Sequence, residues 1–497
     1  MISFVILLLA LTAILTFLLQ KHRNKRNLQW PPGPQGLPLI GNLHQLDSST
    51  SQFHLWQLSK KYGPLMSLQL GFVPALVVSS SKMAEEIMKT HNLKFSSRPP
   101  KLAQQKLSYN GLDLAFAPYD FCYIEMKKIC VVHLLNSNRV KASYPIREFE
   151  VTQMLENISK LADASQSIDL SKTIFSLSRT IICRVAFGKR YDEEETNQRK
   201  FQALLQETEA LFTTFFVSDY FPFLGFIDKL IGLMHRLEKN FQEFDIFLEN
   251  IVQEHLDSSR SKTHIQEDIV DVLLQIWKDG SSKVDLSLNH IKGVIMNIFV
   301  GASDTITATV IWAMTYLMKN PIAMKKIQEE VRGIVGNKGL VNEDDIPNLS
   351  YLKLVVKETL RMQPPIPIIP RESTQDCRID GYQIPAKTVI HVNLFAIGRD
   401  PQAWENPEEF CPERFIGKFI DFKGQNCELI PFGAGRRLCP GISIGLATVE
   451  LCLANLLYKF DWELPNGMKK EDLDMDTQPG ITMHKKNALC LMARRYI

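Results

Sequence analysis

One cysteine of this chain stands in a glycine-rich turn directly ahead of a predicted helix, and this arrangement constrains the fold more than any other feature. The turn reads Pro431-Phe432-Gly433-Ala434-Gly435-Arg436-Arg437-Leu438-Cys439-Pro440-Gly441, and the apolar helical run 442–460 follows it. The positive end of a helix and its free N–H groups stabilise a thiolate at such a place. Gly433 and Gly435 permit a tight turn that brings the backbone close to a flat ligand. Arg437 can reach an anionic group, although a glycine-rich turn around a buried thiol is the simpler alternative.

Composition and cysteine spacing exclude several classes of protein. The nine cysteines are scattered, odd in number and without a C-x-x-C pair, so neither a disulfide scaffold nor a zinc site is indicated. Free thiols of this kind are typical of a reducing compartment. The formal net charge of +3 gives no reason to expect nucleic acid as a partner. No residue pattern repeats at the periods of solenoids or propellers.

The N-terminus carries an apolar run followed by basic residues. The run 2–19 is apolar except for Ser3, Thr12 and Thr16, and as a helix it would span about 27 Å, close to the hydrocarbon thickness of a bilayer. A cleaved signal peptide is the alternative, but its charge normally precedes a shorter apolar core. Here the basic residues at 21–26 follow the run. We therefore expect a retained transmembrane anchor over 1–20, with the rest of the chain on the cytosolic side.

A basic and proline-rich segment then leads into one long body. The prolines of Pro31-Pro32-Gly33-Pro34 forbid a continuous helix, so we expect a stop signal and hinge over 21–38 and one domain over 39–497. Helical periodicity dominates this domain, for example over 204–215, 237–255 and 321–335, whereas the strand-like stretches 65–70, 75–79 and 388–393 are short. The predicted fold class is mainly α with small β sheets. The sequence has no βαβ alternation and no glycine-rich nucleotide-binding turn, so electrons for any redox chemistry must come from elsewhere.

Two further predicted helices carry polar side chains of interest. In the segment 351–362, Glu358 and Arg361 are three residues apart and share one helix face. An exposed pair of this kind is common and contributes little stability. The long apolar segment 287–318 contains Asp304 and Thr305. A bare acid beside a hydroxyl group in such a helix indicates functional burial or a helix irregularity.

Taken together, these residues resemble the cytochrome P450 superfamily. The string F-x-x-G-x-R-x-C-x-G around Cys439 matches the haem-binding signature of that superfamily at every fixed position, and the resemblance covers essentially the whole chain from the proline hinge onward. It implies the cytochrome P450 fold, a haem b cofactor and Cys439 as the axial ligand of the haem iron. Haem contacts are implied for Cys439, Arg437, Phe432, Gly435, Arg371 and Lys127. Lys127 ends the stretch 123–127, where the family typically has W-R-x-x-R and this chain has Tyr-Ile-Glu-Met-Lys.

The resemblance also implies roles for the remaining polar residues. Glu358 and Arg361 match the E-x-x-R motif, and with Arg414 of Pro412-Glu413-Arg414-Phe415 they are implied to form a buried structural triad. Asp304 and Thr305 resemble the acid and alcohol of the distal helix, which supply protons to dioxygen and steer cleavage of its O–O bond. Ala302 and Ile306 depart from the glycine and the second hydroxyl residue that are common there. Substrate contacts are implied for Phe116, Phe212, Phe216, Ala302, Ile366, Ile368 and Ile481, and the phenylalanines at 212, 215 and 216 favour a flat or aromatic substrate.

The details are similar to those of plant microsomal A-type enzymes, namely Phe95-Ser96-Ser97-Arg98-Pro99 and Glu343-Asp344-Asp345-Ile346-Pro347. Within them the chain resembles a branch with aldoxime-oxidising and terpenoid- or alkaloid-hydroxylating members. The resemblance implies insertion of one oxygen atom from O2 into a lipophilic small molecule of specialised metabolism, a terpenoid, alkaloid, phenolic or aldoxime. Electrons would come from NADPH through NADPH–cytochrome P450 reductase, with cytochrome b5 as a further partner, at the endoplasmic reticulum membrane. Lys127, Lys128 and Arg436 would dock the acidic face of the reductase.

Two other classes of function remain open at this stage. A haem-thiolate isomerase or dehydratase needs neither O2 nor a reductase, but such members often lack the distal alcohol that Thr305 supplies. A non-catalytic haem sensor or membrane scaffold would not need Asp304 and Thr305 at all. The substrate and the oxidised position depend on the side-chain geometry of the pocket, which a sequence does not show.

Overall fold

A computed structural model of the chain describes residues 29–46, 51–190, 195–257, 267–465 and 467–496. The predicted anchor over 1–20 lies outside the described residues, as does the basic part of the hinge. The helices are α2 (Ser51–Tyr62), α3 (Ser81–Glu85), α4 (Leu102–Leu107), α5 (Phe121–Ile129), α6 (Ser137–Ala142), α7 (Tyr144–Asp163), α8 (Leu170–Phe187), α9 (Glu195–Thr213), α10 (Phe226–Leu230), α11 (Leu233–Leu256), α12 (Ile269–Lys278), α13 (Leu288–Lys319), α14 (Pro321–Val335), α15 (Ser350–Met362), α16 (Leu394–Ile397) and α17 (Ile442–Lys459). The strands are β1 (Leu65–Leu70), β2 (Val73–Val78), β3 (Ile168–Asp169), β4 (Ile368–Glu372), β5 (Cys377–Ile379), β6 (Tyr382–Ile384), β7 (Val389–Asn393), β8 (Phe460–Glu463) and β9 (Cys490–Arg495).

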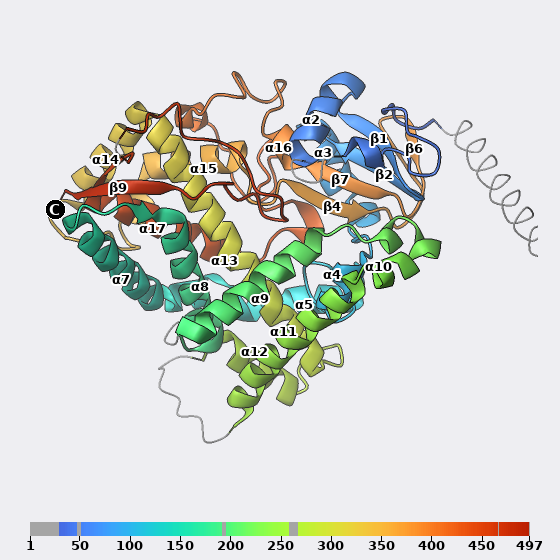
Figure 1. Ribbon diagram of the computed structural model, residues 1–497, viewed down its shortest axis with the longest axis horizontal. Helices are drawn as coiled ribbons and strands as arrows, with labels where there is room; N and C mark the ends of the chain where they lie inside the picture. Colours follow the sequence, from blue (N-terminus) through green and yellow to red (C-terminus); the bar gives the residue numbers. More distant parts are fainter. Residues whose placement is uncertain (1–28, 47–50, 191–194, 258–266, 466, 497) are drawn as a thin grey trace, which may run out of the picture.

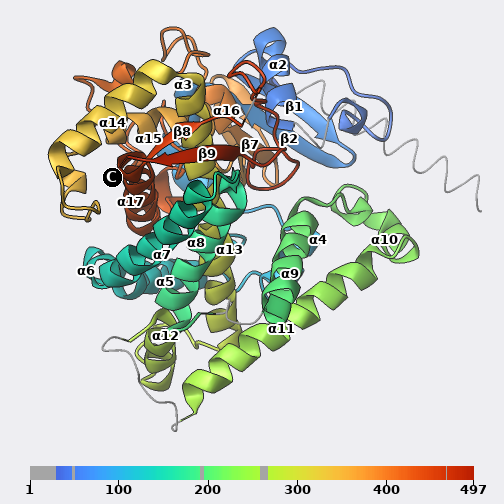
Figure 2. The same cartoon turned by 60° about the vertical axis from the view of Figure 1, so that its left-hand side comes forward.

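Helix α13 is the central element of the molecule. It begins at a capping box in which His290 Nδ1 accepts from Ser287 N–H at 3.1 Å. It ends at Lys319, and the side chain of the next residue, Asn320, caps α14. Pro321 then occupies the first turn of α14, where its missing N–H costs nothing. Figure 2 shows α13 between α7 and α8 on one side and α9 and α11 on the other. The functional residues predicted on α13 are therefore held inside the domain.

The β structure is small and gathers mostly on one side of the molecule (Figure 1). The largest sheet has the strand order β1-β2-β7-β4, in which β2 and β7 are parallel and the other pairs are antiparallel. In β4 exposure alternates along the strand, so Ile369 and Arg371 both point to the buried side. A second sheet has the order β3-β9-β8, and β5 and β6 form a hairpin. Strand β4 thus delivers a buried arginine to the interior.

Two large apolar cores meet at α13. One packs α13 against α7, α8, α14, α15 and α17, and the other packs it against α4, α5, α9, α11 and α12. In the described part of the chain, α13 and α17 are long and apolar enough to cross a bilayer by length and composition. Their most apolar windows are 72% and 61% buried inside the fold. We conclude that their apolar character serves the core.

Most predicted elements occur close to their predicted bounds. Strand β1 and helix α14 match the predicted 65–70 and 321–335, and β7 matches 388–393 to within one residue. The predicted C-terminal boundary of the helix 204–215 was wrong, because α9 ends at Thr213 and residues 214–216 are not helical. This shift changes where the phenylalanines at 215 and 216 point.

Candidate active site

Cys439 lies between the 3-10 turn η9 (Gly435–Arg437) and α17. Its N–H donates to Phe432 O at 3.0 Å, and Gly441 N–H donates to Cys439 Sγ at 3.3 Å. Burial raises the pKa of the Cys439 thiol, while the Gly441 N–H and the Lys127 ammonium act in the opposite direction. Because burial has the larger effect, a thiolate here needs a further positive partner. A bound metal cation is such a partner, since a coordinating thiol is deprotonated outright.

The two glycines of the turn are required by its backbone. Gly433 has a φ of +75° and Gly435 a φ of +69°, in the left-handed region that favours glycine. A Cβ on Gly435 would lie 2.2 Å from the carbonyl oxygen of Met88. Gly435 was predicted to contact the cofactor, but its close neighbour in the structure is this main-chain segment. Phe432 is half-buried and packs edge-on against Phe422, with ring centroids 5.6 Å apart.

Three arginines converge beside the cysteine turn. They are Arg98, which is half-buried ahead of α4, and the buried Arg371 on β4 and Arg437 in η9. Burial, Arg371 and Arg437 together lower the pKa of Arg98, and burial and Arg437 lower the pKa of Arg371 to about 9. The charge of the buried Asp113 acts on Arg98 and Arg437, but among the described residues no carboxylate lies within ion-pair distance of any of the three arginines. A group of like charges away from water is costly unless an anion joins it, so this cluster is suited to binding an anionic ligand.

The guanidinium groups of this cluster are held rather than free to move. Arg437 Nε donates to Ser96 O at 2.7 Å, and its guanidinium carbon lies 3.9 Å from the centroid of the Tyr123 ring. Arg98 Nε donates to Ala115 O at 2.8 Å. Arg371 makes only one long hydrogen bond among the described residues, 3.4 Å to Pro370 O. Arg371 therefore keeps the most donors available for a ligand.

Lys127 adds a fourth cation at the edge of the cluster. Its Nζ donates to the carbonyl oxygen of Arg436 at 2.5 Å, which ties α5 to the cysteine turn. Burial is the main cause that lowers the pKa of Lys127 to about 8, and Arg437 and Arg371 lower it further. The charge of the Cys439 sulfur acts in the opposite direction and raises the pKa of Lys127. Lys127 therefore lies near both the sulfur and the arginines.

Glu358, Arg361 and Arg414 form one buried cluster. Arg361 donates to the two carboxylate oxygens of Glu358 at 2.7 and 2.8 Å, and Arg414 Nε donates to Oε1 at 2.9 Å. The main-chain N–H of Cys411 donates to the same Oε1 at 2.8 Å. The outer donors of both arginines reach main-chain carbonyls, including Pro407 O and Glu405 O, each at 2.7 Å. The cluster thus fastens α15 to the loop that contains η8 (Pro412–Phe415).

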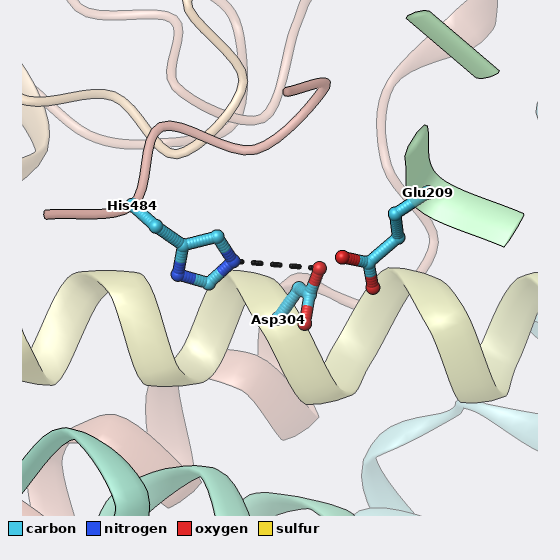
Figure 3. A group of neighbouring side chains, drawn as sticks. All are labelled: Glu209, Asp304 and His484. Atoms are coloured by element: carbon cyan, nitrogen blue, oxygen red, sulfur yellow. Dashed lines mark ion pairs between the residues drawn. The ribbon is translucent and has the colours of Figure 1, made fainter. Parts of the chain in front are cut away.

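Asp304 and Thr305 leave α13 on different sides. Thr305 Oγ1 donates to Gly301 O at 2.8 Å. Gly301 is exposed although it lies in the middle of a buried helix, and a Cβ added to it would meet no atom within 4 Å. Open space therefore adjoins α13 at this point, and Ala302 and Thr305 are half-buried beside it. Asp304 is buried and its Oδ2 lies 3.4 Å from His484 Nε2, with Glu209 of α9 on the other side (Figure 3).

The predicted pocket residues have different environments. Phe116 and Phe212 pack together with ring centroids 4.8 Å apart. Ile366, Ile368 and Ile481 are half-buried, as expected for side chains next to open space. Phe216, by contrast, is completely buried in the core and has no accessible surface toward a pocket. Phe215 stacks on Tyr220 at 4.9 Å between centroids, so the three phenylalanines do not form the predicted cluster.

Comparison with known proteins decides the family. The profile of the family described as Cytochrome P450 matches residues 31–492. The chain is a cytochrome P450. It is 45% identical over 504 residues to the 6,7,8-trihydroxycoumarin synthase of Pastinaca sativa, with 99% of each chain covered. It is 47% identical to the strychnine-11-hydroxylase of Strychnos nux-vomica, over 96% of this chain and 94% of that one. It is 48% identical to cytochrome P450 71A1 of Persea americana, over 99% of each.

These relatives confirm the predicted superfamily, its plant A-type and the monooxygenase class of this cytochrome P450. The fold also matches a solved zebra fish cytochrome P450 with abiraterone, at a TM-score of 0.74 and 24% identity, over 90% of this chain and all of that one. At that identity the likeness concerns the fold alone. Membership in the family brings a haem cofactor and the use of O2.

The residues present fit a haem. The Cys439 sulfur lies directly ahead of helix α17 and accepts from the Gly441 N–H. The three arginines form one cluster around Arg437 of the same turn, and no carboxylate of the described residues is ion-paired with them. Sequence reasoning missed Arg98, although it belongs to the Phe95–Pro99 string that marks the plant A-type enzymes. It also missed Glu209 and His484 next to Asp304. Glu209 precedes Phe212 by three residues and so shares its helix face, whereas His484 stands in a loop with no comparable signal.

Proposed function

We propose that this cytochrome P450 inserts one oxygen atom from O2 into a lipophilic, flat small molecule of plant specialised metabolism. The observation that carries the proposal is the Phe116–Phe212 pair at 4.8 Å between ring centroids, in the apolar cluster against which Ala302, the neighbour of Gly301, packs. Aromatic side chains bind flat rings through their faces and edges. The names of two relatives, a coumarin synthase and a strychnine hydroxylase, concern flat or polycyclic molecules and support this class.

The haem would be held by the residues described above. Cys439 would ligate the iron, and Arg371, Arg437 and Arg98 would neutralise the anionic side groups, with Lys127 at the edge. Phe432 would pack on the cysteine side. When bound, the haem supplies activation of O2, with a thiolate that pushes electron density toward the bond to be cleaved. Glu358, Arg361 and Arg414 would act on the fold rather than on the reaction.

Asp304 and Thr305 would manage protons for this reaction. Thr305 Oγ1 lies beside the open space and can offer its hydroxyl hydrogen there when it releases Gly301 O. The Asp304 carboxylate is the neighbouring titratable group on α13 and can pass a proton to that side. Haem-thiolate isomerases and dehydratases often lack the distal alcohol, so the presence of Thr305 supports the monooxygenase.

The partners follow from the same proposal. NADPH would supply electrons through NADPH–cytochrome P450 reductase, with cytochrome b5 as a further donor. Lys128 and Arg436 are exposed on the cysteine side of the molecule, while Lys127 is half-buried between them. We expect these three cations to face the acidic surface of the reductase. Charge reversal of all three should weaken reductase-dependent turnover and its dependence on salt.

A single N-terminal pass through the endoplasmic reticulum membrane would place the domain in the cytosol. An exposed apolar patch on the described domain supports contact with that membrane: Phe223 is 87% exposed and Leu230 78% exposed. Phe72 N–H donates to Tyr220 O at 2.9 Å, and Gly71 N–H donates to Ile40 O at 3.2 Å. These bonds join the patch to the end of the hinge and the residues after it, where Leu37 and Leu39 are also exposed.

The first test is the reduced, carbon-monoxide-bound absorption spectrum of microsomes that express the chain, beside a Cys439→Ala control. A strongly red-shifted Soret band that the control lacks is the expected result, and an unshifted band would overturn the assignment of Cys439. Coumarins and polycyclic alkaloids would then be screened with NADPH and reductase. Product formation that does not need NADPH, or that Thr305→Ala leaves fully coupled, would overturn the monooxygenase mechanism.

A further inference from the structure

Three side chains from distant parts of the sequence meet above the middle of α13 (Figure 3). Glu209 comes from α9, Asp304 from α13 and His484 from the loop ahead of β9. Their charge-bearing atoms all lie within 4.8 Å of one another. Asp304 is the innermost of the three, because it is only 2% exposed, whereas the His484 side chain is 26% exposed. The cluster therefore connects a buried carboxyl group to side chains that water can reach.

Two carboxyl groups this close cannot both be ionised without a large cost. Burial and the hydrogen bond with Asp304 raise the pKa of Glu209 to about 10. Asp304 shows the opposite direction: burial alone would raise its pKa, but Glu209 and His484 together lower it. Glu209 is therefore the partner that carries the proton at neutral pH, within 4.8 Å of the Asp304 carboxylate. The pair holds one proton that can be transferred.

Within the described residues, the cluster of three side chains is electrostatically separate from neighbouring charged groups. In the described part of the chain, Glu209 and His484 are the titratable groups that shift the pKa of Asp304, and Asp304 is the one that shifts the pKa of Glu209. Lys485, next to His484, is engaged with Asp474 at 2.7 Å. Asp304 Oδ2 is buried and has no hydrogen bond of ordinary geometry within the described residues. It is therefore free to accept a proton.

We propose that Glu209 stores the proton that recharges Asp304, and that His484 is a positioning residue that holds the Asp304 carboxylate beside it. The proposal rests on the proposed function. Insertion of one oxygen atom consumes one O2, two electrons and two protons, and releases one water with the oxidised substrate. Glu209 gives its proton to the Asp304 carboxylate, Asp304 passes that proton toward Thr305, and Glu209 regains a proton from water through the exposed side of the cluster. The electrons come from NADPH, and the cluster supplies none.

The stored proton can be tested without turnover. Infrared spectra of the haem-loaded protein at about pH 9 would show the C=O stretch of a protonated carboxyl group, identified by its shift in D2O. At that pH the carboxyls of Asp113 and Glu450, with a pKa of about 6 and 7, have lost their protons. We expect the band in the wild type, its loss in Glu209→Gln, and its retention in Glu207→Gln. Glu207 lies on the same helix but pairs with Arg236 at 2.8 Å, outside the cluster. Absence of the band from the wild type would overturn the proposal.

Turnover then tests the use of the proton. With the substrate found in the screen above, we expect Glu209→Gln to lower product formed per NADPH by about 10²-fold, the lower end of what a general acid step contributes, and to release more peroxide. Glu207→Gln should remain coupled, and the haem content of both variants should be that of the wild type. His484→Gln removes one group that lowers the pKa of Asp304, so the acid limb of coupling should move to higher pH.

The outcomes separate this proposal from the proposed function. A wild type that makes product with NADPH while Glu209→Gln keeps full coupling would overturn the proton store and leave the monooxygenase intact. A wild type without NADPH-dependent product would overturn the proposed function and with it the use of the proton. The infrared band would still show whether the proton itself is held at Glu209. An unchanged pH profile in His484→Gln would overturn the positioning role.

Discussion

Glu358 receives both hydrogen bonds of a forked Arg361 guanidinium, at 2.7 and 2.8 Å, where neither side chain has any exposed surface. The same carboxylate accepts from Arg414 and from the main chain of Cys411. All of its acceptor capacity is therefore used inside the protein. Removing the charge of Glu358 leaves two buried guanidinium groups short of a counter-charge, and this is more costly than losing one exposed pair.

The Glu358→Gln substitution should destabilise the fold by about 3–5 kcal/mol, the range for breaking a buried ion pair. We expect the variant to give less soluble protein and to unfold at a lower denaturant concentration than the wild type. Glu329→Gln is the matched control, because Glu329 forms an exposed pair with Lys325 at 3.7 Å and should change stability by less than about 0.5 kcal/mol. Equal stability of the two variants would contradict a structural role for Glu358.

Arg371 should have opposite effects with and without haem. In the haem-free protein its buried charge stands beside Arg437, and burial and this neighbour together lower its pKa to about 9. Arg371→Met removes that charge and should stabilise the haem-free protein by about 1 kcal/mol or more. In the haem-loaded protein the same change removes a partner of the anionic groups, so transfer of haem to apomyoglobin should be about tenfold faster, since a charged hydrogen bond contributes about 1.5–3 kcal/mol.

The exposed Arg378 on β5 provides the control for this pair of measurements. Arg378→Met should change neither the unfolding free energy of the haem-free protein nor the rate of haem transfer. Should Arg371→Met destabilise the haem-free protein as well, the arginine would have a packing role instead of an anion-binding one.

Lys127 makes the stability of the haem-free protein depend on pH. Its pKa is about 8 in the folded chain, against an ordinary value of 10.5. Below about pH 8 both the folded and the unfolded chain carry the proton. Between about pH 8 and pH 10.5 only the unfolded chain binds it, so unfolding takes up a proton and the free energy of unfolding rises with pH. The lowered pKa thus destabilises the fold at neutral pH and ceases to do so in alkali.

The measurement is the difference in unfolding free energy between wild type and Lys127→Met across that pH range. The difference cancels the contributions of tyrosines and cysteines, which titrate in the same pH range in both proteins. We expect the free energy of unfolding of the wild type to rise relative to that of the variant from about pH 8 upward. This rise should become smaller once haem is bound, because its anionic groups stabilise the ammonium. A difference that is flat with pH would show that Lys127 is not held near the arginines.

Much of this fold could be predicted because its signals are local. The strand β1 and the helices α14 and α17 have the periodicity and the flanking residues of their class within their own sequence. The arrangement of Glu358, Arg361 and Arg414 followed from recognising a family pattern, because nothing in the spacing of Arg414 places it against α15. Periodicity and flanking residues thus predicted the helices and strands, whereas the contact of Arg414 with Glu358 was predicted from the family resemblance.

What the sequence missed depends on contacts between distant segments. The end of α9 at Thr213 separates Phe212, which meets Phe116, from Phe216, which is buried in the core. No periodicity marks that end, because residues 214–216 remain apolar or hydroxyl-bearing. In the same way, His484 reaches Asp304 only because the loop ahead of β9 folds back over α13. Such a contact has no local signature.

Gly435 provides a last test that separates packing from cofactor contact. Its φ of +69° and the 2.2 Å from a built Cβ to Met88 O leave no room for alanine. The obstacle is the main chain of 86–90, which cannot move aside as a flexible side chain could. We expect Gly435→Ala to destabilise even the haem-free protein, by about 1–3 kcal/mol for a residue held in a strained conformation, with little change in its intrinsic affinity for haem once folded. Gly333→Ala is the control, since Gly333 lies in α14 with no atom within 4 Å of a Cβ and should gain about 0.5–1 kcal/mol from lower chain entropy. A Gly435→Ala protein as stable as the wild type but unable to retain haem would place Gly435 in direct contact with the cofactor instead.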